Sequence, residues 1–262
     1  MRQLLNMTAG VYDYTMDDAF GRAFDRDPLM AFGPRDAIRI VKRHEPSFAP
    51  GEGVSYSDSN YVLLGLVVQR VTHRSLGRVI RHRILKPLGM SHTSYPPGSA
   101  MPDPHARGYV EAPDGSLRDV TRVNPGVASG AGAMISTLGD LRIWARALAK
   151  GTLLSRETHR KQLRTVPFPG QVLDVGYGLG VLDINDFIGH NGAIYGYGSA
   201  MFYLPRANAT IVVEGNLSSN FSGIPTSVFY GIANYLFPRQ FETAEADHRR
   251  GAAAPDQLLT PR

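Results

Sequence analysis

A tyrosine and a serine stand side by side just before a strongly apolar stretch of the chain. Residues 56–61 read YSDSNY and follow a loop at 46–53 that is rich in Pro and Gly. A tyrosine hydroxyl held at the start of a buried helix can point into a cleft and exchange protons with a bound molecule. The structural alternative is that Tyr56 is a half-buried aromatic residue, and that Ser57 or Ser59 caps the helix.

A second group of polar and small residues ends an apolar run in the other half of the chain. Residues 189–193 read GHNGA and contain His190 and Asn191. A glycine at the end of a strand lets a ligand approach the backbone closely, and the neighbouring strand amides can donate to an oxyanion. The structural alternative is a simple turn with a histidine of no catalytic role.

Other common catalytic motifs are absent. No serine has glycine at both second neighbours, and the chain has no HExxH, no P-loop and no GxGxxG that opens a helix after a strand. It has no cysteine, and its eight histidines lack metal-ligand spacing. We therefore expect neither a metal nor a cofactor. Several carboxylates could be imagined as a general acid and base, but nothing in their spacing favours it: Asp17, Asp18, Asp174, Asp183 and Asp186.

Size and composition describe a globular protein. The chain has 262 residues, 43% of them apolar, enough for one large domain or two closely packed ones. The formal net charge is +5. The densest basic cluster is spaced for a solvated helix face, and no recognition motif accompanies it, so we expect no nucleic-acid partner: Arg70, Arg74, Arg78, Arg81, Arg83 and Lys86.

Targeting signals are also missing. The first ten residues have no apolar core and no small-residue cleavage site, so they do not form a signal peptide. The longest apolar run, residues 62–68, is too short to span a bilayer. Expressed as written, the chain is expected to be cytoplasmic and to have no membrane span.

The first part of the chain, residues 1–165, has mainly helical and loop-like patterns. Residues 59–72 predict a helix that is apolar nearly all round and therefore buried, and residues 76–85 predict a more polar helix. Residues 91–126 are rich in Pro, Gly and Asp and predict loops. Thr137 with Asp140 predicts a helix start, and Gly151 predicts its end.

The second part, residues 166–238, changes to short strands. Residues 177–184, 187–191, 199–204 and 210–215 predict strands, and their short connections indicate an antiparallel meander. The spacing of Ile224, Val228, Ile232 and Leu236 predicts a helix that covers one face of this sheet. From 239 to 262 the chain turns polar and rich in Ala and Pro, which predicts a disordered tail. The fold class is therefore α+β.

Taken together and in this order, the two motifs resemble those of the serine β-lactamase-related hydrolases, which include class C β-lactamases, DD-carboxypeptidases and esterases. Residues 3–10 (QLLNMTAG), 131–137 (AGAMIST) and 177–180 (YGLG) also match segments of that family in the same order. The resemblance covers about residues 2 to 237. It implies a β-lactamase/transpeptidase-like fold, with an antiparallel sheet flanked by helices and a helical region beside it.

The resemblance also implies roles for the motif residues. Tyr56, with its proton affinity lowered by a neighbouring cation, would be the general base for the nucleophile and the acid for the leaving group. Asp58 stands where most relatives have Asn to bind the substrate amide, and an ionised Asp cannot donate. His190 would bind the substrate carboxylate. Asn191 and Gly192 would line the substrate site, and the backbone amide of Ala193 would donate to the oxyanion, a contribution of roughly 3 kcal/mol.

The nucleophile of this family, the Ser of Ser-x-x-Lys, is absent. Each of the four lysines has a residue other than Ser three places before it: Arg39, Arg83, Ala147 and Thr158. In the family this motif precedes the QLLNMTAG-like segment, so it would lie before Met1, together with the first strands and the nucleophile helix. Their absence would leave apolar faces and a sheet edge without partners. We interpret the chain as truncated at its N-terminus rather than as an evolved pseudoenzyme.

Two functions remain open at this point. The first is a serine hydrolase that acts on D-alanyl peptides, β-lactams or small esters, inactive in this form, with a small molecule or peptidoglycan peptide as substrate. Asp58 and His190 favour a peptidase or esterase over a dedicated β-lactamase. The second is a non-catalytic protein that keeps the cleft for binding. A full-length relative of the first kind would be periplasmic or extracellular.

Overall fold

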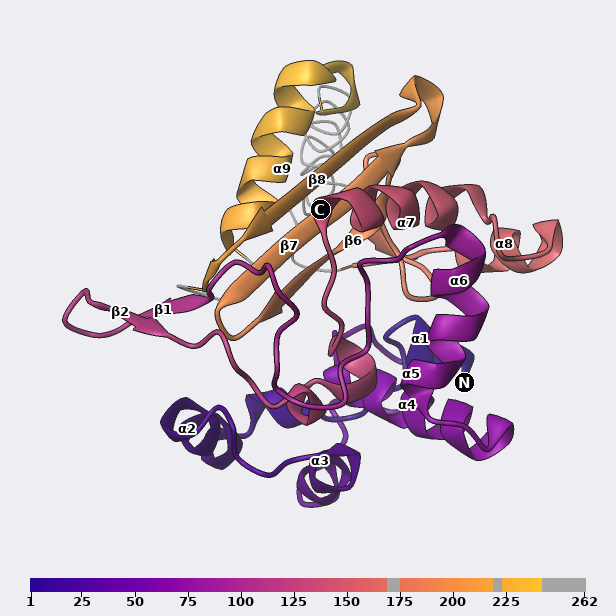
Figure 1. Ribbon diagram of the computed structural model, residues 1–262. Coiled ribbons are helices and arrows are strands. Elements are labelled where there is room, and N and C mark those ends of the chain that lie inside the picture. The colour runs from indigo at the N-terminus through magenta and orange to yellow at the C-terminus, as the bar shows by residue number, and fades with distance from the viewer. Residues whose placement is uncertain (169–174, 219–222, 242–262) are drawn as a thin grey trace, which may run out of the picture.

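The chain folds as a helical region packed beneath one end of a twisted antiparallel sheet, as a computed structural model shows (Figure 1). The structure describes residues 1–168, 175–218 and 223–241. Within them the sheet contains β3 to β8 in sequence order: β3 (Val166–Pro167), β4 (Val175–Tyr177), β5 (Leu182–Ile184), β6 (Phe187–Ile194), β7 (Tyr197–Leu204) and β8 (Ala209–Gly215).

Each of these strands pairs antiparallel with the next, which confirms the predicted meander. The strand expected at 177–184 is in fact two strands, β4 and β5. They are separated by a turn in which Gly180 has a φ of +74°, a conformation that favours glycine. Asn208, at φ +51°, closes the turn between β7 and β8 in the same left-handed region.

Two helices cover opposite faces of the sheet (Figure 1), and the side chains of β7 pack alternately against one and the other. Ala200 and Phe202 are buried in a cluster with α9 (Gly223–Leu236). Met201 and Tyr203 are buried in a second cluster with α7 (Leu138–Lys150). Because successive side chains of a strand point to opposite faces, both faces of this sheet are apolar and both are covered.

The α7 helix begins and ends as predicted. The hydroxyl oxygen of Thr137 accepts a hydrogen bond from the Asp140 amide at 3.3 Å, which caps the first turn. Gly151 ends the helix in the left-handed conformation, with φ +65°. The helix belongs to the region expected to end at residue 165, yet it packs on β6, β7 and β8 of the sheet.

The α9 helix covers the sheet as expected, but with a different face. Phe229 and Ala233 are fully buried against the strands. The predicted stripe points outward: Ile224, Val228, Ile232 and Leu236 are all exposed. The helix has apolar residues on most sides, so spacing alone could not select the face that packs.

The helical region contains several short helices and one long one. They are α1 (Arg2–Leu5), η1 (Tyr14–Met16), α2 (Asp18–Arg26), α3 (Pro34–Val41), α4 (Asp58–Thr72), α5 (Leu76–Ile80), a π-helical turn η2 (Arg81–Leu85), α6 (Lys86–Leu88), η3 (Pro125–Val127), η4 (Ser129–Ala131) and α8 (Arg156–Gln162). The 3-10 turn η5 (Pro205–Ala207) lies between β7 and β8. The long helix, α4, follows Tyr56 and Ser57 directly.

The α4 helix is buried only over its first half, which corrects the expectation of a helix buried all round. Ser59, Asn60, Val62 and Gly65 are buried, whereas Val71 near its end exposes 72% of its surface. Gly65 lies against the backbone of Gly130 in η4, so the two segments approach closely where neither has a side chain. The buried half of α4 is therefore the half that carries the tyrosine motif.

Part of the segment expected to be loop forms a small second sheet. β1 (Tyr109–Glu111) pairs antiparallel with β2 (Leu117–Asp119) and parallel with β9 (Leu217–Ser218). These strands are two or three residues long, and one partner lies more than 100 residues away. Neither periodicity nor turn chemistry reveals such a pairing.

The segment predicted as a tail begins with packed residues. Gln240 and Phe241 are both buried, and Phe241 belongs to the α9 cluster. Residues 242–262 lie outside the described part of the chain.

We predict that Phe229 contributes far more to stability than any residue of the outward stripe. Phe229→Ala should lower the free energy of unfolding by about 3–5 kcal/mol, because it removes a fully buried ring from between helix and sheet. Tyr235→Ala, on the same helix at 84% exposure, is the matched control and should change it by less than about 0.5 kcal/mol. Urea denaturation followed by circular dichroism measures both. Equal losses would mean that α9 packs through its other face.

Candidate active site

Three rings from the two halves of the molecule meet at one end of the sheet. Tyr56 precedes α4, Tyr177 ends β4, and His190 lies in β6. The ring centroids of Tyr56 are 6.2 Å from Tyr177 and 6.3 Å from His190. Those of Tyr177 and His190 are 5.7 Å apart. The two sequence motifs, 134 positions apart, are thus brought together at one site.

The Tyr56 loop is fixed by a buried methionine. Met7 has a left-handed backbone, φ +64°, and is fully buried. Its sulfur accepts from the Ser57 amide and from the Asn60 side-chain amide, each at 3.4 Å, and its carbonyl accepts from the Ser55 amide at 3.0 Å. Residues on both sides of Tyr56 are therefore bound to Met7, Ser55 through the Met7 backbone and Ser57 through its sulfur.

The serines of the motif have structural positions that differ from simple capping. Ser57 occupies the N-cap of α4, yet its side chain makes no capping bond, and its buried hydroxyl has no hydrogen-bond partner within the described residues. The Ser59 hydroxyl accepts from the Tyr14 amide at 3.0 Å. Ser57 is thus the N-cap residue that the structural alternative expected, but it makes no side-chain hydrogen bond to the first turn.

Asp58, the first residue of α4, has an unusually high proton affinity. Burial, and to a smaller extent the nearby Asp13, raise the pKa of its carboxyl to about 7, although a hydrogen bond with Tyr56 opposes both effects. A carboxyl with this pKa is protonated in about half of the molecules at pH 7. When protonated it can donate a hydrogen bond, as an Asn would. The donor that an ionised Asp58 lacks is therefore present in part of the population.

Tyr56 has a raised pKa, in contrast to the expected lowering. Burial is the largest cause, followed by the negative charge of Asp58 and by Tyr61 and Asp13. Tyr56 nevertheless exposes 41% of its surface. Among the described residues, none of the groups that shift this pKa is a cation. The expectation of a neighbouring cation is therefore wrong for this part of the chain.

His190 is held through both of its ring nitrogens. Nε2 lies 3.0 Å from the Tyr177 hydroxyl, and Nδ1 makes a short contact with the Asn191 carbonyl. Burial lowers the pKa of the ring, and the bond to the Asn191 carbonyl opposes this in part. His190 is therefore mostly neutral at pH 7.

The remaining residues of the second motif lie on different sides of β6. The Asn191 side chain donates to the Thr226 hydroxyl of α9 at 3.2 Å, so it points away from His190 to the other face of the sheet. The structure thus places the Asn191 side chain, which was expected to line the substrate site, on the opposite face of the sheet from His190. Gly192 is half-buried and Ala193 is exposed.

The end of β6 presents an open edge on the side where β5 ends. β5 pairs with Phe187, Ile188 and Gly189 only, whereas β7 pairs with β6 as far as Ile194. Within the described strands, residues 190–194 therefore have a neighbour on one side alone. Alternate backbone groups along this stretch are open to a ligand, which suits the oxyanion role expected for the Ala193 amide.

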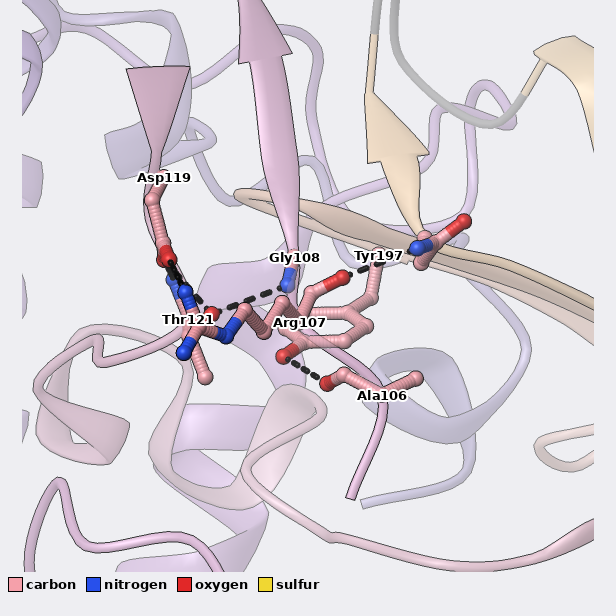
Figure 2. A network of polar contacts seen from close by, with 7 residues as sticks. Ala106, Arg107, Gly108, Asp119, Thr121 and Tyr197 are labelled. Atoms are coloured by element: carbon pink, nitrogen blue, oxygen red, sulfur yellow. Dashed lines mark hydrogen bonds and ion pairs between the residues drawn. The ribbon is translucent and has the colours of Figure 1, made fainter. Parts of the chain in front are cut away.

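A polar network holds the turn that follows Ala193. Figure 2 shows the Tyr197 hydroxyl donating to the Ala106 carbonyl at 2.8 Å and the Gly108 amide donating to the Thr121 hydroxyl at 3.0 Å. The Asp119 carboxylate accepts from both the amide and the hydroxyl of Thr121. A Cβ on Gly108 would lie 2.4 Å from the Tyr197 ring. The β1–β2 ribbon is thereby fastened to the β6–β7 hairpin.

Several residues of this site were not found by sequence reasoning. Tyr177 and Tyr61 were noted only as parts of matching segments, and Asp13 and Met7 were given no role. The Tyr61 hydroxyl donates to the Leu5 carbonyl at 2.8 Å, and burial raises its pKa to about 12. Their proximity depends on how β4 and α1 pack beside α4, for which the sequence has no local signal.

Two kinds of feature are absent from the described residues. No group of three His, Cys, Asp or Glu side chains there could hold a metal ion. Likewise, no helix in the described ranges is long and apolar enough to cross a membrane.

Comparison with known proteins identifies the family. A family model described as Beta-lactamase matches residues 1–225. The chain belongs to the β-lactamase family. This β-lactamase-family chain is 34% identical to a D-stereospecific amidohydrolase from Streptomyces sp., covering 82% of this chain and 67% of the other, with a TM-score of 0.78. The predicted fold is thereby confirmed.

Two further relatives show how far the similarity extends. The D-amino acid amidase from Ochrobactrum anthropi SV3 is 26% identical over 85% of this chain and 66% of its own, with a TM-score of 0.72. Protein flp of Staphylococcus aureus is 29% identical over 236 residues, which is 84% of this β-lactamase-family chain. The chain spans 44% of the length of that curated relative.

We predict that Asp58→Asn stabilises the protein at high pH. Because the folded-state pKa is raised, the favourable contribution of the protonated carboxyl is complete below about pH 4 and is lost as the pH rises through about 7. Asn cannot ionise, so the variant should gain about 1–2 kcal/mol at pH 8, a value reduced for the partial exposure of the side chain. Denaturant unfolding at pH 4, 6 and 8 measures the difference.

Asp114→Asn provides a control of opposite sign. The exposed Asp114 carboxylate accepts from the Ser116 hydroxyl and amide, which lowers its pKa. This variant should therefore lose rather than gain stability at pH 8. A gain for Asp58→Asn that is the same at pH 4 and pH 8 would contradict the proton linkage.

Proposed function

We propose that the cleft at Tyr56 and His190 is the acyl-transfer site of a hydrolase that cleaves amides or esters of D-configured acyl groups. The proposal rests on one observation: Tyr56 lies beside a stretch of β6 that has no neighbouring strand on one side. Tyr56 lies 6.3 Å, ring to ring, from His190, and β6 is unpaired on one side from His190 to Ile194 within the described strands. A proton-transfer group and oxyanion donors are the two parts that acyl transfer requires.

In this proposal the residues act in sequence on one carbonyl. Tyr56, ionised beside the lysine of a Ser-x-x-Lys segment, takes the proton of the attacking serine hydroxyl as the tetrahedral intermediate forms, and returns it to the leaving amine or alcohol as that intermediate collapses. The Ala193 amide donates to the oxygen that becomes negative. Asp58, when protonated, donates to the acyl amide of the substrate, and Gly192 leaves room for the substrate beside the strand.

The proposed substrate class follows from two supports. Two of the similar solved structures are described as a D-stereospecific amidohydrolase and a D-amino acid amidase. The site also has a neutral His190 where a carboxylate-binding residue was expected. Both favour an amide or ester substrate over a β-lactam or a D-alanyl peptide with a free carboxylate.

The nucleophile is the part that this chain does not contain. No lysine has a serine three residues before it, and no cation lowers the pKa of Tyr56 among the described residues. We therefore propose that the chain as given is silent in acyl transfer, and that a Ser-x-x-Lys segment completes the site. The same absence favours a second candidate function, a non-catalytic protein that binds acyl-D-amino acid compounds in the cleft.

We predict that the chain as given is not acylated. Incubation with a fluorescent penicillin, followed by denaturing electrophoresis and intact-mass spectrometry, should show no adduct. D-alanine p-nitroanilide should not be hydrolysed above the rate of buffer. A labelled serine adduct or measurable turnover would contradict the silent state.

The two candidate functions are separated by the upstream reading frame. If that frame continues and encodes Ser-x-x-Lys, the extended protein should hydrolyse D-alanine p-nitroanilide. Tyr56→Phe in the extended protein should then lower kcat by about 10²–10⁴-fold. If the frame is closed by a stop codon, the hydrolase proposal fails and the binding function remains.

A further inference from the structure

The tautomer of His190 follows from its partner at Nδ1. That partner is the backbone carbonyl of Asn191. A carbonyl oxygen can only accept a hydrogen bond, so Nδ1 must carry the proton. The proton at Nδ1 is therefore committed to the protein's own backbone and is not available to a ligand.

The second nitrogen is occupied by Tyr177. The Tyr177 hydroxyl lies 3.0 Å from Nε2, and Tyr177 exposes only 1% of its surface. In a neutral ring with the proton on Nδ1, Nε2 has a lone pair and accepts from this hydroxyl. Both nitrogens of His190 thus have protein partners before any ligand arrives.

The groups around the ring do not favour a charged imidazolium. Tyr177 reaches it from β4 and Tyr56 from the segment before α4, and both have pKa values raised well above the ordinary value, so both are neutral at pH 7. Met201, the residue paired with His190 on β7, is apolar. Burial itself penalises the charged form of the ring.

We propose that Tyr177 is a positioning residue that, with the Asn191 carbonyl, holds His190 as a neutral imidazole, so that the site selects substrates without a carboxylate. The proposal rests on the acyl-transfer function proposed above, and it names the substrate class of that same site. A carboxylate needs a cation or free donors to replace its water, and His190 offers neither. A neutral amide or ester does not require a charged partner. The role of His190 is then opposite to that of a carboxylate-binding residue.

The electrostatic surroundings of the cleft work in the same direction. Asp58 and Asp13 lie close enough for Asp13 to raise the proton affinity of Asp58. A substrate carboxylate would add a third negative group to this pair. An uncharged acyl group avoids that repulsion.

Nitrogen-15 NMR of the intact chain tests the state of His190 directly. In long-range proton–nitrogen spectra at pH 7, Nδ1 should have the shift of a protonated nitrogen and Nε2 that of a nitrogen with a lone pair. Tyr177→Phe should move the Nε2 resonance, since it removes the hydroxyl. Tyr203→Phe is the matched control: Tyr203 is equally buried and loses a bond to Asn208, yet it should leave the His190 signals unchanged.

Binding of a matched pair of ligands tests the selectivity. N-acetyl-D-alaninamide and N-acetyl-D-alanine differ only at the C-terminal group, which is an amide in the first and a carboxylate in the second. The chain should bind the amide about tenfold or more tightly than the acid, the cost of a charged group left without its partner. Tyr177→Phe should reduce this ratio, because Nε2 becomes free to take up a proton and pair with the acid.

Each outcome decides the proposal. A wild-type His190 that is protonated on both nitrogens, or on Nε2 alone, overturns it, and so does equal or tighter binding of the acid or binding of neither ligand. If Tyr177→Phe does not fold, the wild-type spectrum and the ligand pair still decide. Neither measurement needs turnover, so a failure of the hydrolase proposal, seen as no acylation by the extended protein, is distinguishable from a failure of this one.

Discussion

The pairing register of β6 with β7 determines on which side of the sheet each residue of the second motif lies. His190 is opposite Met201 and Asn191 is opposite Ala200, so His190 faces the helical region and Asn191 faces α9. A slip of one residue would exchange the two. Gly189 helps to hold this register, because a Cβ there would lie 2.0 Å from the Met201 carbonyl oxygen. The core on both faces of β7 and the chemistry of the cleft therefore depend on one alignment.

The charge balance of the cleft is the second constraint. Asp58 and Asp13 supply negative charge, His190 is mostly neutral, and Tyr56 is a poor proton acceptor unless a cation approaches it. A group with a high proton affinity that is also desolvated costs stability in the folded state, and such costs are common at sites that bind or react. The site therefore favours a positively charged group near Tyr56 and an uncharged group near His190.

The parts of this fold that could be predicted are those with local causes. The α7 helix has its cap at Thr137 and its stop at Gly151, and the meander follows from short turns between strands. The motif residues Tyr56 and His190 were found because family segments recur in order along the chain. Their proximity, by contrast, is a product of tertiary packing.

What could not be predicted depends on contacts between distant segments. The outward stripe of α9 has the same spacing as the inward one, and only the sheet selects between them. The pairing of β1 with β9 joins very short strands across more than 100 residues. The bond between Tyr177 and His190 requires three strands in register, so no window of sequence contains it.

The outer side of α9 lies beside β8, the last described strand of the sheet, and both surfaces leave groups without a partner in the described part of the chain. β8 has a strand neighbour on one side only within the described sheet, and Ile224, Val228 and Leu236 are exposed on the helix that packs over it. Unpaired backbone groups and an apolar ridge together form a border to which other extended chains adhere. We therefore expect self-association at high protein concentration to limit work with this protein before thermal unfolding does. A dilute sample without assemblies should form them as the protein concentration rises.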